Sequence, residues 1–101
     1  MIPSGNLTIA VNVTNFTLVN MLGAKNVPGE GHLHYYMDVP VPTTPGKPAI
    51  TAVGTFTPTY NTSWTWPNVA PGKHNFSVQL ANNDHTPVIP LVYATVNVTV
   101  T

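Results

Sequence analysis

The chain has 101 residues, no cysteine and a formal net charge of zero, and only 6% of its residues are charged. This length fits a single domain, residues 1–101, that is large enough to bury a core. The lack of cysteine excludes disulfides, thiolate zinc sites and iron–sulfur clusters. Three lysines and no arginine give too little positive charge to hold nucleic acid or an anionic membrane surface. No apolar run reaches the length of about 18 residues that a membrane span needs.

The sequence is rich in Asn-x-Ser/Thr triplets, the acceptor pattern for N-glycosylation in exported proteins. Chance predicts about two such triplets for this composition. Six occur, at Asn6, Asn12, Asn15, Asn61, Asn75 and Asn97. The excess predicts a secreted or cell-surface glycoprotein, in a low-charge style that resembles archaeal surface proteins. The alternative is that Asn and Thr simply alternate on the solvent faces of strands.

Short segments of alternating apolar and polar residues, separated by eleven prolines and seven glycines, indicate an all-β fold. Two strands are expected before residue 22, with a shift of phase between them. Their core-facing residues are Leu7, Ile9, Val11, Val13, Phe16 and Leu18.

After a loop at residues 23–31, a strand follows that contains a His-x-His motif. Its apolar set, expected to face the core, is Leu33, Tyr35, Met37 and Val39. The alternate set, expected to face outward, is His32, His34, Tyr36 and Asp38. The proline-rich residues 40–48 cannot pair regularly, so we expect an extended crossing segment there.

A strand is predicted at residues 50–57, with a turn near Pro58 and another strand at residues 61–66. Trp64 and Trp66 lie on one side of that last strand. We expect them to pack inward, and a stacked platform for sugars is the alternative.

A tight corner at residues 68–74 leads into a strand whose predicted core face is His74, Phe76, Val78 and Leu80. His74 at this corner is interpreted as structural. A polar loop spans residues 81–90, and the last strand is expected to bury Ala94, Val96, Val98 and Val100. About seven strands predict a two-sheet antiparallel sandwich, immunoglobulin-like or cupredoxin-like.

The His-x-His motif has a chelating geometry on a strand. Residues two apart share a face and lie about 6.6 Å apart, which allows two imidazoles to converge on one ion. If this strand runs antiparallel to the strand of residues 73–82, His32 and His34 lie at the same end as His85. Glu30 and Asp84 are then candidate additional ligands, whereas His74 lies at the far end and is the weaker candidate.

Imidazole ligands without thiolate suit copper, zinc or nickel, and the sequence does not choose among them. Met37 points to the wrong face to serve as an axial ligand. No catalytic motif of the hydrolase or metalloprotease type is present, and three acids in total are few for paired-carboxylate chemistry. We therefore expect a protein that is not an enzyme.

Three motifs together resemble the DUF4399-like domains, a family of small exported domains of unknown function. They are the Gly31 to His34 strand with Met37-Asp38, the Pro71 to His74 corner and the Asp84 to Pro87 loop, and the resemblance covers residues 31–101. It implies an exported β-sandwich whose histidines form a metal site, with no activity attached. The chain differs from the family pattern at Leu33, where a middle histidine is usual, and in a loop with fewer histidines.

The sequence thus predicts an extracellular sandwich module that binds copper or zinc through His32, His34 and His85. The alternatives are a structural or adhesive surface module without metal, or a carbohydrate-binding module. The expected partners are a metal ion and, in the alternatives, other surface proteins or glycans.

Overall fold

A computed structural model describes residues 5–13, 16–19, 25–27, 29–44, 46–51, 55–88 and 91–100. These residues form seven strands and no helix, so the predicted all-β fold is confirmed, and none of them belongs to a helix that could cross a membrane. The strands are β1 Gly5–Ala10, β2 Thr17–Leu18, β3 Glu30–Met37, β4 Phe56–Thr59, β5 Ser63–Val69, β6 Gly72–Ala81 and β7 Tyr93–Val100.

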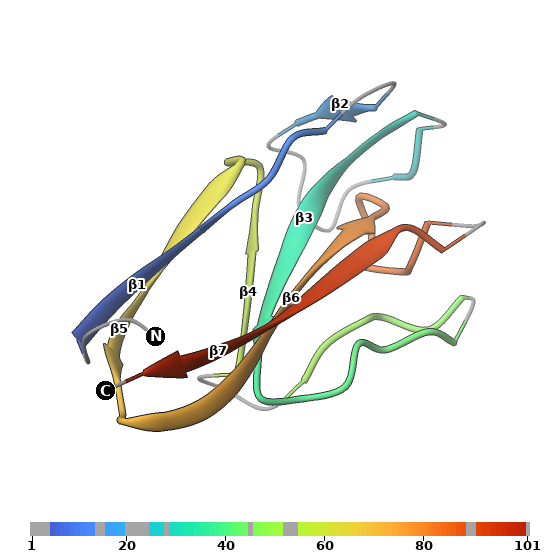
Figure 1. Cartoon of the computed structure of the whole chain (residues 1–101). Coiled ribbons are helices and arrows are strands. Elements are labelled where there is room, and N and C mark those ends of the chain that lie inside the picture. The colour runs from blue at the N-terminus through green and yellow to red at the C-terminus, as the bar shows by residue number, and fades with distance from the viewer. Residues whose placement is uncertain are drawn as a thin grey trace.

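The strands form two sheets of unequal size (Figure 1). The smaller sheet is the antiparallel pair β1 and β5. The larger sheet has the order β2-β3-β6-β7, and β4 also pairs with β3. All pairs in it are antiparallel except the short β2–β3 contact, which is parallel. The long antiparallel strands β3 and β6 therefore form the centre of the larger sheet.

The hydrophobic core lies between the two sheets. From β3 and β6 it takes alternate residues, including Leu33, Tyr35 and Phe76, and it meets Leu7 and Trp66 from the smaller sheet. Trp64 packs against the same core, with its ring at 6.2 Å from the ring of Trp66 in an edge-to-face arrangement. The predicted inward packing of the two tryptophans is therefore confirmed.

The opposite face of β3 is also buried, which corrects one expectation. The alternation is as predicted, but His32, His34 and Tyr36 are 0% exposed rather than solvent-facing. The reason is that the segment between β3 and β4, which Figure 1 shows in green leaving the end of β3 and returning to β4, supplies hydrogen-bond acceptors to this face. Only Asp38, at the end of the strand, is exposed as expected.

The last strand is less buried than its alternation suggests. Val98 and Val100 are at least half-buried, but Ala94 and Val96 are exposed. The smaller sheet has only two strands, so it does not cover the part of β7 that contains Ala94 and Val96. The strand predicted at residues 50–57 begins only at Phe56, and Pro58 lies within β4 rather than in a turn. Residues 52–54 lie outside the described residues. The same holds for Met21, where the second strand was expected to end.

Gly31 is required where β3 approaches β6. A Cβ atom at this position would clash with the carbonyl oxygen of Ala81 and would lie 2.9 Å from the ring of Phe16. Because only glycine permits this approach, the backbone of β3 comes close to the end of β6 immediately before His32.

Candidate metal centre

Three histidine rings converge at one end of the larger sheet. Nε2 of His32 lies 2.9 Å from Nε2 of His34, and each of these atoms lies 3.2 Å from Nδ1 of His85. His32 and His34 are fully buried and His85 is half-buried. The three nitrogens form a compact triangle of one ligand atom per residue, a group that could hold a metal ion.

The strand direction inferred from the sequence explains why these residues meet. β3 and β6 are antiparallel, and His32 pairs with Ala81, the last residue of β6. The loop that follows β6 therefore starts beside the His-x-His motif. In that loop the amide of His85 donates to the carbonyl of Asn82 at 2.9 Å, and His85 has a φ of 73°. This left-handed conformation is uncommon outside glycine, and it sets the direction from which the ring enters.

The proton position on His34 is fixed by its surroundings. Its Nδ1 lies 2.9 Å from the carbonyl oxygen of Ala49 and 3.0 Å from the hydroxyl of Tyr36. A carbonyl oxygen only accepts, so Nδ1 must carry the hydrogen. The other nitrogen of a neutral ring, Nε2, then presents a bare lone pair to the triangle, as a metal ligand must.

A chain of buried polar groups supports this arrangement. The hydroxyl of Tyr36 lies 2.8 Å from both the carbonyl of Ala49 and Oε1 of Gln79, and its single hydrogen serves these two acceptors. The amide nitrogen of Gln79 donates to the carbonyl of Pro42 at 2.8 Å. The orientation of the Gln79 amide is thereby set, and with it that of Tyr36.

Burial keeps the two strand histidines neutral. Desolvation, with the neighbouring His85 as the second cause, lowers the pKa of His32 from 6.5 to about 4. Desolvation, followed by the proximity of His32, lowers the pKa of His34 to about 3. Both rings are therefore uncharged at neutral pH. A metal that binds them would not have to compete with the second proton that an imidazolium ring carries.

The three ring nitrogens cannot all be joined by hydrogen bonds at once. Nε2 of His34 is an acceptor, so hydrogen bonds to it require donors on the other two rings. If both His32 and His85 direct an N–H group into the triangle, these two N–H groups face each other. If only one of them does, the other ring and His34 direct lone pairs at each other. At least one side of the triangle is therefore repulsive in every neutral state, whereas a central cation would accept all three lone pairs.

The triangle is small enough for one ion to contact all three nitrogens. With metal–nitrogen bonds of about 2.05 Å, the observed separations correspond to N–metal–N angles of about 90°, 103° and 103°. An ion held by His32, His34 and His85 would have three protein ligands, which would leave a further coordination position for water or another ligand.

The two acids predicted as additional ligands are not part of this group. Oδ1 of Asp84 accepts hydrogen bonds of 2.5 Å from the hydroxyl and 3.1 Å from the amide of Thr86, which lower the pKa of Asp84. Asp84 therefore shapes the loop that carries His85. Glu30 is half-buried at the start of β3 and is not among the converging ligand atoms.

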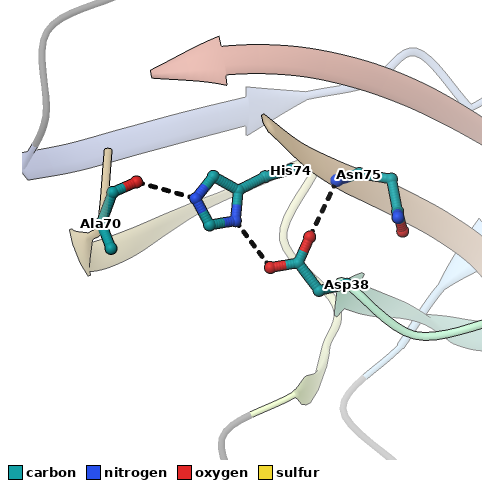
Figure 2. A network of polar contacts seen from close by, with 4 residues as sticks. All are labelled: Asp38, Ala70, His74 and Asn75. Atoms are coloured by element: carbon teal, nitrogen blue, oxygen red, sulfur yellow. Dashed lines mark hydrogen bonds and ion pairs between the residues drawn. The ribbon is translucent and has the colours of Figure 1, made fainter. Parts of the chain in front are cut away.

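His74 lies at the other end of β6, as the sequence predicts, and has a different role. Nδ1 lies 2.6 Å from Oδ2 of Asp38 and Nε2 lies 2.7 Å from the carbonyl of Ala70, as Figure 2 shows. Both partners are acceptors, so both ring nitrogens must carry hydrogen, and the bond to Asp38 raises the pKa of His74. The ring is a half-buried imidazolium that joins the end of β3 to the turn before β6, rather than part of the core.

Ala49, Tyr36 and Gln79 are the residues of this site that sequence reasoning missed. Tyr36 and Gln79 could have been found, because alternation places Tyr36 on the histidine face of β3 and places Gln79 on the face of β6 opposite to Phe76 and Val78, and antiparallel pairing sets Gln79 beside His34. Ala49 carries no signal in sequence, since it contributes only its backbone. Comparisons with protein-family models, with curated proteins and with solved structures found no match to this chain.

Proposed function

We propose that this protein is an extracellular β-sandwich module that binds one divalent transition metal ion through His32, His34 and His85. The observation that carries the proposal is the convergence of three ring nitrogens within 3.2 Å of one another. One of them, Nε2 of His34, is held as a free lone pair by the bond from Nδ1 to Ala49. Metal-binding histidines commonly use this second hydrogen bond to fix the ring.

Among the metals that the ligand set suits, we favour zinc. None of the angles expected at the ion approaches 180°, whereas Cu(II) favours a tetragonal arrangement with opposite ligands. A pyramidal set of three imidazoles with one open position is a geometry that Zn(II) adopts in proteins. Copper would still compete, because Cu(II) binds nitrogen ligands more tightly than Zn(II) in general.

Export and the absence of catalysis are further parts of the proposal. The acceptor asparagines Asn12, Asn61 and Asn97 are exposed, which supports glycosylation of an exported chain. We assign no reaction to the site: within the described residues, the converging group holds three histidines and no carboxylate.

Cobalt substitution tests the metal proposal. The purified chain, freed of metal by a chelator, should bind one equivalent of Co(II) and develop the intense visible absorption of a four-coordinate ion, and one equivalent of Zn(II) should abolish that absorption. A chain that binds neither ion would contradict the proposal and would favour the alternative of a structural or adhesive module.

A further inference from the structure

The segment between β3 and β4 lies over the polar face of the larger sheet. We call residues 40–44 and 46–51 the strap; none of them belongs to a strand or helix. Within the described residues, the hydrogen bonds that join the strap to β3, β6 and the loop after β6 end on four residues. These are His34, Tyr36, Gln79 and His85.

Ala49 links the strap to two of the three candidate ligands. Its carbonyl accepts the hydrogen of His34 Nδ1 at 2.9 Å, and its amide donates to the carbonyl of His85 at 2.8 Å. Ala49 is 0% exposed. The backbone of one strap residue therefore spans the gap between a ligand on β3 and a ligand on the loop after β6.

Without a metal, the repulsion within the triangle weakens the hydrogen bond between the Ala49 amide and the His85 carbonyl. His32 and His34 are on one strand, but His85 is on a loop, so the repulsive side of the triangle is most easily relieved by a shift of His85. Such a shift would move the carbonyl to which Ala49 donates. In addition, Nδ1 of His32 has no hydrogen-bond partner among the described residues, which favours placing the His32 proton inside the triangle.

We propose that metal binding closes the strap over the polar face, so that the strap is a metal-dependent element of the fold. This inference rests on the proposed function. With an ion bound, His85 would be held beside His32 and His34, and its carbonyl would stay aligned with the amide of Ala49, which donates to it at 2.8 Å. Without the ion, the strap detaches more often and exposes His34, Tyr36 and Gln79.

Amide hydrogen exchange with and without Zn(II) tests the inference, because exchange reports local opening. In the full chain, one equivalent of Zn(II) should slow exchange of the Ala49 amide by about tenfold or more. The Asp38 amide, which donates to the carbonyl of Asn75 at 2.8 Å at the far end of β3, is the internal reference and should change by less than about twofold. Zinc content is measured in the same samples.

Two variants sharpen the result. His85→Asn removes the ligand but keeps the backbone carbonyl, and asparagine tolerates the left-handed conformation; zinc should no longer protect Ala49 in this variant. His74→Ala, far from the triangle, should keep the full protection. If zinc binds at one equivalent but the exchange of Ala49 is unchanged, or if His85→Asn is protected as well as the parent chain, strap closure is wrong although metal binding stands. If no zinc binds, both proposals fail.

Discussion

The Nδ1–H group of His34 donates a 2.9 Å hydrogen bond to the carbonyl oxygen of Ala49. Because that oxygen can only accept, the bond selects the tautomer in which Nε2 of His34 is a free ligand atom. The acceptor comes from a segment outside the sheet. The chemical state of a residue on β3 is thus set by the backbone of the strap.

Removal of the Tyr36 hydroxyl should affect stability more than metal binding. Tyr36→Phe leaves Oε1 of the buried Gln79 without its hydrogen from Tyr36, and an unsatisfied buried acceptor costs about 1–3 kcal/mol. The bond from His34 to Ala49 remains, so zinc affinity should fall by no more than about tenfold. Denaturant unfolding and zinc titration of this variant measure the two effects. An unchanged free energy of unfolding would contradict the polar chain described for Gln79.

Substitution of Gly31 should be far more damaging than substitution of Gly46. Gly31→Ala brings a Cβ atom against the backbone carbonyl of Ala81, which neither strand can easily relieve, and we expect a loss of about 3 kcal/mol in the free energy of unfolding. Gly46 has a φ of 75° but open space around it, so Gly46→Ala should cost only about 1 kcal/mol. Equal losses would mean that β3 and β6 do not approach as closely as described.

Acid should destabilise the metal-free protein before its carboxylates titrate. The pKa values of about 4 for His32 and about 3 for His34 in the folded state lie below the ordinary value of 6.5. The unfolded chain therefore binds more protons in this window, and stability is lost as pH falls from about 6.5 toward these values. The melting temperature should drop steadily between about pH 7 and pH 4.5. Zinc should raise the melting temperature but should not reduce the drop, because the metal-bound rings bind no protons and metal affinity itself falls in acid. A melting temperature that stays constant would show that the two rings are not buried.

Alkali should remove a different contribution, that of His74. The pKa of this ring is raised by its bond to Asp38, so its contribution is complete below the ordinary value of 6.5 and is lost as pH rises through the raised value. The difference in melting temperature between the parent chain and His74→Ala should therefore be largest near about pH 6 and shrink as the pH rises through the raised pKa of His74. A difference that grows with pH would contradict the imidazolium assignment.

Most of the fold and the meeting of the three histidines follow from local pattern. Period-two alternation identifies the faces of β3 and β6, and their antiparallel pairing brings His85 to His32 because the loop begins where β3 begins. Exposure could not be predicted in the same way. Alternation places His34 opposite to Leu33, but whether that face meets water depends on where the proline-rich segment lies.

The same limit applies to β7 and to His74. Val96 alternates with solvent-facing residues as a core residue would, yet it is exposed because the smaller sheet has only two strands. His74 shares the predicted core face with Phe76, but its ring bonds to Asp38, a residue distant in sequence that has a φ of 58° and follows the end of β3. The exposure of Val96 and the position of the His74 ring both depend on how far neighbouring strands extend and where they end. The residues next to Val96 and His74 in the sequence do not indicate this.

Calorimetric titration of Zn(II) into the parent chain and three variants tests the central claim most directly. His34→Ala and His85→Asn each remove one of the converging nitrogens, so each should weaken binding by more than about tenfold, which is about 1.4 kcal/mol. His74→Ala should bind zinc within about twofold of the parent chain, because its ring lies at the other end of β6. Loss of binding in His74→Ala equal to that in His34→Ala, or unchanged affinity in all three variants, would contradict a metal centre built from His32, His34 and His85.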